Sequence, residues 1–453
     1  MNKLLHQNRI GYVLYHLFKS CAVSDDLKKR FVFDETGDAN ALPCVLFPLS
    51  EHSLRLNDVL VIDEIPVLFP MSNTKTFYRF EGNSLYFEHD LLKSTFYLLS
   101  GYQEYNSPEK DILGRFPYEK SVQAQLDIIE KPIVNYYFEK IITALEEFCQ
   151  RNHIPFARRK LFDNYGFFLT HDVDKIDQFN FTDSIFKIKQ LLKFAPAKIA
   201  YSRLLKANLT YLFNAINIFY RKNSFWNFAQ LHQIEKDLGL RSAWYFLTND
   251  SPADSYYNFS ESRIRKLIEF LETNGHEVGI HGTIRSAHNS SAMQDVLSKL
   301  NNLTCRNVIG GRQHRLMFNM PQTHLIQEKL ALKYDSTLGF AGHEGFRNSY
   351  CLPFKLYDFE EERIIDVWEF PLIVMDGTLF SYRQLTNEQA LVQIKKLTRE
   401  VSKFHGLFTF LWHNSFFDDR LYPEISTFYG NALKTIIDDK PDIVLGRDLI
   451  NIL

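Results

Sequence analysis

The stretch "NYGFFLTHDVDK", residues 164–175, begins as a buried strand and ends in a group of charged side chains. Its apolar run from Gly166 to Leu169 is typical of a strand inside a sheet. Because side chains along a strand alternate between its two faces, Asp172 and Asp174 should point to the same side. Two such carboxylates repel each other unless a cation lies between them or one is protonated. The pair therefore indicates a metal site or, as is more common for a single Asp pair, a helix cap or an ion pair with Lys175.

Strands and helices alternate along the chain after about residue 161. The pattern predicts helices over 225–240 and 260–275, and strands over 241–250 and 276–282. Such alternation favours an α/β fold with a parallel sheet, open or closed into a barrel. Residues 176–224 interrupt it with one or two predicted long helices. Their amphipathic, Lys/Arg-bearing sequence suits a lid, a dimer surface or a membrane-surface element, and does not decide between them.

Residues 1 to about 155 have a different pattern, typical of a mixed α/β unit. Residues 59–70 are strand-like, whereas 89–105 and 131–150 have the apolar spacing of helices. The segment 151–160 is basic and contains a proline, which is typical of a domain boundary. We therefore predict an N-terminal α/β domain over residues 1–158 and a barrel domain over residues 159–453, with the helical insertion at about 176–224.

The composition excludes several classes of protein. The 453 residues are 45% hydrophobic and 23% charged, with a net charge of -2, so nucleic acid is not an expected partner. The five cysteines are scattered and form no CxxC pair, which argues against a disulfide framework or a thiolate zinc site. No run of about 18 apolar residues and no signal-peptide pattern occurs, so we expect a cytoplasmic protein with no transmembrane segment.

Polar side chains collect where several predicted strands end. Besides the Asp pair, these residues are His276, His281, Arg312, His314, Arg315, Asp335, Glu369, Asp376, His413 and Asn414. The C-terminal ends of parallel strands form the face that holds the active site in α/β barrels. Each position is a weak signal, but together they indicate one site. We expect His171 at the surface or beside this site, and His276 in a structural role.

Four motifs occur in order between about residues 161 and 450: "LTHDVD", "NGHEVGIHG", "GRQHRLMF" and "LFTFLWHNS". This series resembles the polysaccharide deacetylase family, the NodB-homology domain of carbohydrate esterase family 4. The resemblance implies a deformed (β/α) barrel. "LLSGYQEY" and "KPIVNYYFEKI" in the first 160 residues resemble the extra N-terminal domain of a bacterial subgroup. The role of that domain stays open.

The resemblance also implies a metal site, with one departure. Asp174 and His281 match the family's first two ligands, but the position of its second histidine, four after His281, is Arg285. A guanidinium group has no free lone pair, so it cannot replace that ligand. A catalytic zinc usually keeps three protein ligands, and His314 and His288 are both available. We favour His314, because strand ends are held more rigidly than loops.

The catalytic roles follow from the same resemblance. Asp172 matches the family's base, and Arg312, with Arg315 as the competitor, matches the arginine that holds this base. His413 matches the general acid, a role that suits a side chain able to donate a proton near neutral pH.

Together these matches imply a hydrolase that removes acetyl groups from an N-acetylated sugar or polysaccharide with the help of a divalent metal, for which Zn²⁺ is expected. Two alternatives stay open. The barrel could hydrolyse another amide or ester, or the missing histidine could mark a catalytically inactive barrel that binds a glycan or a partner protein. The sugar, the native metal, the oligomeric state and the role of the insertion cannot be read from the sequence.

Overall fold

The computed structural model describes residues 3–33, 42–177, 223–251, 254–419 and 424–453, together with the single residues 189, 192, 194, 205 and 422. The helical insertion predicted at about 176–224 falls almost entirely outside these residues.

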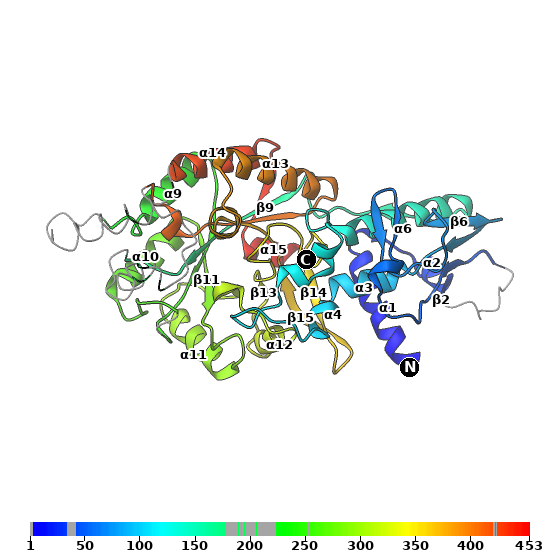
Figure 1. Cartoon of the computed structure of the whole chain (residues 1–453), viewed down its shortest axis with the longest axis horizontal. Coiled ribbons are helices and arrows are strands. Elements are labelled where there is room, and N and C mark those ends of the chain that lie inside the picture. The colour runs from blue at the N-terminus through cyan, green and yellow to red at the C-terminus, as the bar shows by residue number, and fades with distance from the viewer. Residues whose placement is uncertain are drawn as a thin grey trace.

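A curled sheet of ten strands forms the centre of the larger part of the molecule (Figure 1). Its strands lie in the order β14-β15-β13-β12-β11-β10-β9-β17-β16, with β18 also paired to β9, and only the β14–β15 pair is antiparallel. The strands are β9 (Gly166–Val173), β10 (Ala243–Phe246), β11 (Glu277–Gly282), β12 (Gly310–Gln313), β13 (Tyr334–Asp335), β14 (Phe354–Asp358), β15 (Arg363–Glu369), β16 (Leu372–Met375), β17 (Leu407–Leu411) and β18 (Asp442–Ile443).

Helices cover the outside of this sheet (Figure 1). They are α9 (Phe228–Asp237), α10 (Ser262–Thr273), α11 (Ser290–Asn301), α12 (Gln322–Lys329), α13 (Asn387–Lys403) and α14 (Ile425–Ile437), with the short turns η4 (His314–Leu316), η5 (Gly377–Tyr382) and η6 (Asn414–Phe416) at strand ends. The last helix, α15 (Gly446–Ile452), lies near the centre of the view in Figure 1, and its Leu449 packs in one apolar cluster with Phe168 and Tyr245 of the sheet. All eight residues of β9 are buried, as expected for a parallel strand covered on both faces. The predicted fold class, a deformed (β/α) barrel, is confirmed, and α9, β10, α10 and β11 each lie inside the range predicted for them.

The N-terminal region is a smaller α/β unit, drawn on the right of Figure 1. A four-stranded sheet of order β2-β3-β7-β6 lies beside the hairpin β4-β5, and β1 pairs with β8. The elements are α1 (Lys3–Leu17), β1 (Cys21–Ala22), α2 (Asp25–Lys29), β2 (Phe31–Phe33), β3 (Val45–Phe47), η1 (Leu56–Asp58), β4 (Leu60–Ile62), β5 (Ile65–Val67), β6 (Tyr78–Glu81), β7 (Ser84–Phe87), α3 (Leu91–Leu99), α4 (Tyr102–Tyr105), η2 (Tyr118–Lys120), α5 (Val122–Gln125), α6 (Ile133–Arg151) and β8 (Ala157–Arg158).

The N-terminal region packs firmly against the barrel. One hydrophobic core runs through both parts. A buried ion pair joins Glu104 of α4 to Arg347, with an N–O distance of 2.6 Å, and the Tyr12 hydroxyl of α1 donates to the Lys355 carbonyl of β14 at 2.9 Å. Breaking a buried ion pair leaves an uncompensated charge. The Glu104–Arg347 pair therefore holds the N-terminal region and the barrel in one arrangement. A domain boundary near residue 158 stays a prediction.

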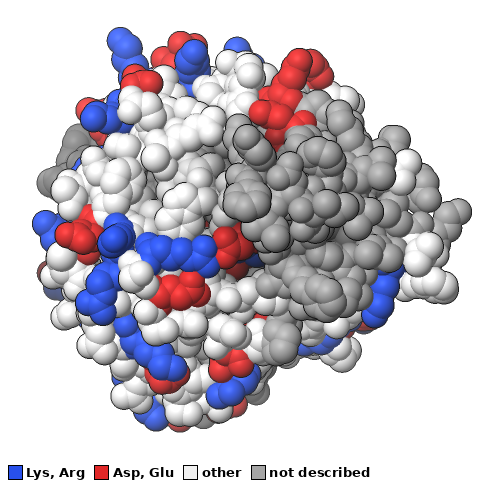
Figure 2. Space-filling view, turned by 90° about the vertical axis from the view of Figure 1, so that its left-hand side faces the viewer, with Lys and Arg blue, Asp and Glu red and all other residues white. Residues whose placement is uncertain are grey.

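The surface carries charges of both signs. On the face shown in Figure 2, Lys and Arg side chains are mixed with Asp and Glu around the described part of the barrel. Within the described ranges, no helix is both long and apolar enough to cross a membrane.

Candidate metal centre

The C-terminal ends of β9, β11, β12 and β17 meet at one face of the sheet. Asp174 follows β9, His281 lies near the end of β11, His314 follows β12 directly, and His413 is two residues beyond β17. Parallel pairing aligns these ends, so side chains from distant parts of the sequence converge here.

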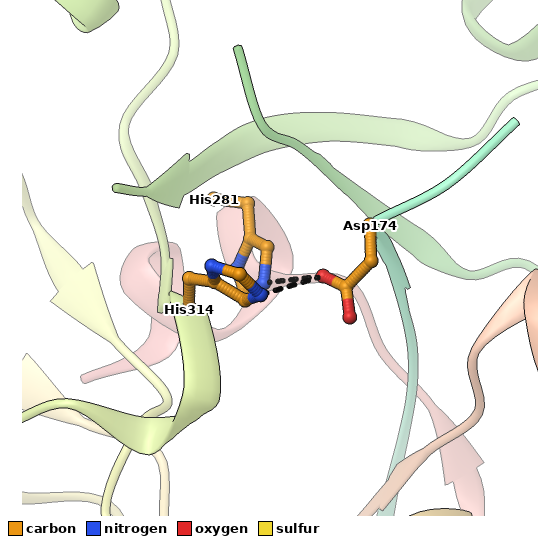
Figure 3. A group of neighbouring side chains, drawn as sticks. All are labelled: Asp174, His281 and His314. Carbon is orange, nitrogen blue, oxygen red and sulfur yellow. Dashed lines mark hydrogen bonds and ion pairs between the residues drawn. The ribbon is translucent and has the colours of Figure 1, made fainter. Parts of the chain in front are cut away.

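Asp174, His281 and His314 form a compact group of possible metal ligands (Figure 3). The Nε2 atom of His281 lies 3.1 Å, and that of His314 3.7 Å, from the same oxygen, Oδ1 of Asp174. One donor atom from each of the three residues lies within 4.8 Å of the other two. Ligands that each sit about 2 Å from a shared zinc ion are at most about 4 Å apart. Both contacts to Asp174 meet this distance.

The imidazole rings are oriented as metal ligands require. Nδ1 of His281 donates to the Arg312 carbonyl at 2.9 Å, and Nδ1 of His314 donates to Oδ1 of Asp254 at 3.1 Å. With the proton on Nδ1, each Nε2 could offer its lone pair to an ion bound beside Asp174. A metal-binding histidine usually passes its other N–H to an acceptor in this way. Two imidazoles and a carboxylate are donors that suit Zn²⁺, so these residues fit the predicted ion.

Asp254 was not identified from the sequence, although it orients His314. It lies in the loop after β10, where neither a strand end nor a motif marks it. Its carboxylate also accepts from the Ile284 amide at 2.9 Å and from the Ser251 hydroxyl at 2.6 Å. These bonds fix the acceptor for His314 in place.

Replacing this acceptor should weaken metal binding. In Asp254→Ala, we expect the affinity for Zn²⁺ to fall by about 10–100-fold, because the His314 ring loses the partner that sets its tautomer and orientation. Competition with a chromophoric chelator measures the affinity. His288→Ala is the matched control, because His288 is exposed and lies outside the ligand group. An unchanged affinity in Asp254→Ala would show that His314 does not bind the ion.

The carboxylates and imidazoles of this group shift one another's pKa values. Burial alone would raise the pKa of Asp174, but His314, His281 and His413 outweigh it and lower this pKa well below its usual range. Burial would likewise lower the pKa of His281, but Asp172 and Asp174 raise it. The carboxylates thus favour positive charge at this point, which a divalent cation would supply.

Asp172 lies beside the ligand group and is held by Arg312. Both side chains are buried, and Nη1 of Arg312 donates to Oδ1 of Asp172 at 2.9 Å. Arg312 also donates to the Ser336 carbonyl at 2.6 Å, which fixes its own position. Oδ2 of Asp172 lies 3.7 Å from Nε2 of His281 and 3.9 Å from Nε2 of His413. Arg315, the alternative match for this arginine, is exposed in the turn η4. The arginine that the structure brings to the Asp172 carboxylate is therefore Arg312.

His413 faces both carboxylates from the opposite side. Its Nδ1 donates to Oδ1 of Asp376 at 2.7 Å, and its Nε2 lies 3.8 Å from Oδ2 of Asp174. Burial would lower the pKa of His413, but Asp376 and the two site carboxylates raise it to about 10. These carboxylates therefore favour the protonated form of His413. Asp376 was recognised as a strand-end residue, but its contact with His413 was not predicted.

Arg285 and His288, the other positions considered for the third ligand, lie outside the ligand group. Arg285 is exposed and pairs with Asp250, with an N–O distance of 3.3 Å, and His288 is exposed in the same turn. The structure brings His314, and not His288, to Asp174.

The expectation that His171 lies at the surface or beside the site is wrong. His171 is fully buried, and its Nε2 lies 2.8 Å from Oε1 of Glu235 on α9. Its ring stacks on Trp244 with centroids 3.9 Å apart. Since it is one residue from Asp172 on the same strand, it points to the opposite face of the sheet, under the outer helices. His276 belongs to the same buried cluster, with its Nε2 2.9 Å from Nδ1 of His232.

A second buried group consists of His324, Asp335 and Glu369. Nε2 of His324 lies 3.1 Å from Oε2 of Glu369. Backbone amides donate to Oδ1 of Asp335 and Oε1 of Glu369, and the side-chain amide of Gln327 donates to Oδ2 of Asp335. Burial raises the pKa of Asp335 to about 7 and that of Glu369 to about 8. Nδ1 of His324 has no hydrogen-bond partner among the described residues, unlike a typical metal-binding imidazole. We interpret this group as a hydrogen-bonded structural cluster with protonated carboxyls.

This cluster should make the protein less stable as pH rises from about 5 to 8. Unfolded Asp and Glu titrate near about 3.9 and 4.3, below the raised pKa values of about 7 and 8 in the folded chain. The folded state therefore binds more protons than the unfolded state in this pH range. The contribution of the two carboxyls to the free energy of unfolding is lost as pH rises through their folded-state pKa values. Glu369→Gln should flatten this dependence, measured by chemical denaturation at pH 5 and 8. The exposed Glu360→Gln should not, and an unchanged slope in Glu369→Gln would contradict the interpretation.

Comparisons with known proteins found one family model and several solved structures. A family described as being of unknown function (DUF7033) matches residues 5–150, from α1 to nearly the end of α6. No curated protein matches the sequence significantly. Among solved structures, one from Mycobacterium smegmatis named as a polysaccharide deacetylase is 14% identical over 64% of this chain and 89% of its own, with a TM-score of 0.40.

Two further structures are similar to the same extent. A protein from Pseudomonas aeruginosa PAO1, also named as a polysaccharide deacetylase, is 14% identical over 64% of this chain and 90% of its own, with a TM-score of 0.42. PuuE allantoinase is 12% identical over 64% of this chain and 89% of its own, with a TM-score of 0.42.

Proposed function

We propose that this chain is a metal-dependent hydrolase that removes the acetyl group from an N-acetylated sugar or polysaccharide. One observation carries the proposal: Asp174, His281 and His314 converge beside an aspartate held by Arg312 and a histidine held by Asp376. The four motifs that resemble the polysaccharide deacetylases supply all of these residues except Asp376. The alignment of a ligand group, a base and an acid at one face supports hydrolysis over a purely structural use of the Asp pair.

Asp174, His281 and His314 would hold a divalent cation, with Zn²⁺ expected from the mixture of nitrogen and oxygen donors. When bound, such an ion polarises a carbonyl group and lowers the pKa of water to about 7.

The other residues of the site would move protons. Asp172 is positioned to accept the proton of the water molecule whose oxygen attacks the acetyl carbonyl carbon. Arg312 fixes the orientation of this carboxylate and balances its charge. As the C–N bond breaks, His413 gives the proton on Nε2 to the leaving nitrogen, and Asp376 keeps the ring aimed at the site. The products are a free amino sugar and acetate.

Acetate release from a panel of N-acetylated oligosaccharides, together with the metal content of the purified protein, tests the proposal. We expect about one divalent ion per chain and acetate release from at least one saccharide. Protein without metal and without activity would favour a barrel that only binds a glycan or a partner. The third outcome is a protein that contains metal and cleaves O-acetyl esters or cyclic ureides but no N-acetylated sugar. This result would favour the alternative of a hydrolase that acts on another amide or ester.

A further inference from the structure

A cavity of about 290 Å³ lies where the N-terminal region meets the barrel. One wall is the N-terminal segment 111–119, and the other consists of residues 339–342, Leu316 and Tyr382 from the barrel. Its volume is near the lower end of the roughly 300–1,000 Å³ typical of ligand sites, and such sites often occur between domains.

The barrel wall of this cavity is built from segments that also carry residues of the candidate metal centre. Leu316 is two residues after His314 and packs in one apolar cluster with Met375 and Leu411. Met375 directly precedes Asp376, and Leu411 is two residues before His413. Tyr382 ends the turn η5, which begins directly after Asp376. The segments that position His314 and His413 therefore continue into the wall of the cavity.

The N-terminal wall is fixed in place by contacts that span the two parts. Nη1 of Arg115 donates to the Arg315 carbonyl at 2.7 Å, directly beside His314, while Nε of Arg115 bonds to Asp111 at 2.8 Å. On the far side, Arg347 pairs with Glu104 at 2.6 Å and donates to the Gly339 carbonyl at 3.0 Å. A wall held in this way needs no rearrangement to receive a ligand, which reduces the entropic cost of binding.

The chemistry of the lining suits a sugar unit. The rings of Tyr118 and Phe340 contact each other with centroids 5.5 Å apart, Phe116 packs on the same Phe340, and Tyr382 is 39% exposed. Carboxylates and a guanidinium group, from Asp111, Glu119 and Arg115, lie among these rings. Aromatic side chains with a polar tip combine a flat apolar face with hydrogen-bonding capacity. A pyranose ring has a matching apolar face and a rim of hydroxyl groups.

We infer that the N-terminal region contributes a substrate subsite: the cavity holds a second sugar unit of the same N-acetylated chain, next to the unit that loses its acetyl group. This inference rests on the proposed function. It gives the N-terminal region a task in catalysis, because part of the substrate-binding surface lies on segment 111–119 and only part on the barrel.

The ratio of kcat/KM for N-acetylated chito-tetraose to that for N-acetylglucosamine tests the subsite. We expect the wild-type protein to prefer the tetramer, and Tyr118→Ala to reduce this preference at least tenfold, mainly through KM. Tyr382→Ala, on the barrel wall, should act in the same direction, and Tyr118→Phe should restore the preference because it keeps the ring. Tyr105→Ala is the matched control, since Tyr105 is a half-exposed tyrosine of α4 that stacks on Phe359 outside the cavity.

Isothermal titration of the tetramer into the purified wild-type and variant proteins separates this inference from the proposed function. Binding that weakens at least tenfold in Tyr118→Ala but not in Tyr105→Ala supports the subsite even if no acetate is released. Equal kcat/KM for both sugars in the wild-type protein, or equal binding by both variants, would overturn it.

Discussion

Asp174→Asn is expected to lose its bound metal and its activity together, whereas Asp172→Asn is expected to keep the metal and lose turnover. The two carboxylates are two residues apart, but their contacts differ. Oδ1 of Asp174 lies close to Nε2 of both candidate ligand histidines, whereas Asp172 is bonded to Arg312 and lies outside the ligand group. Removing a positioned base typically costs about 10²–10⁴-fold in rate. Metal analysis of each purified protein and acetate release from the best substrate of the panel measure both effects.

Asp177→Asn is the matched control for this pair of variants. It is the same substitution three residues beyond Asp174, at a carboxylate that pairs with Arg263 at 2.6 Å. It should keep both metal and activity. If Asp172→Asn and Asp174→Asn also retained full metal and similar rates, the pair would be structural and the proposed hydrolysis would lose its basis.

The sequence predicted the features of the site that depend on strand geometry. The alternation of side chains along residues 166–174 placed Asp172 and Asp174 on one side, and the structure has both facing His281. The same alternation places the side chain of His171 on the opposite face of the sheet from Asp172. The location of His171 was therefore also predictable from the strand geometry. The parallel fold was predictable because buried strands and capped helices leave strong local patterns.

Contacts made by turns and loops could not be predicted. The choice between His314 and His288 depends on the turn after β12, where Arg315 and Leu316 have φ angles of 59° and 54°. These angles are rare for such residues, and no local pattern marks them. Asp254 reaches His314 from a loop 60 residues earlier, and Arg115 reaches the same turn from the N-terminal region, 200 residues away. Such partners follow from the folded chain and not from local spacing.

His413→Ala is expected to keep the metal and to lower kcat by about 10²–10⁴, the usual effect of removing a positioned proton donor. The ring is held by Asp376 and carries its proton toward the two site carboxylates. An aryl acetate, whose leaving group needs no protonation, should be hydrolysed by the variant at a rate much closer to that of the wild-type protein. Asp376→Asn should act in the same direction with a smaller loss, because the ring would remain but would lose its charged partner.

The metal content of His413→Ala decides between a proton donor and a ligand. Nε2 of His413 lies 3.8 Å from Oδ2 of Asp174, close enough for the ring to reach an ion held there. The His413 ring faces Oδ2 of Asp174, however, whereas His281 and His314 both face Oδ1 of the same carboxylate. Full metal with slow turnover in His413→Ala fits the donor. His405→Ala, at a partly exposed histidine bonded to the Asp163 carbonyl, should change neither quantity. Loss of the ion with His413 would make this residue a ligand, and the leaving nitrogen would then need another source for its proton.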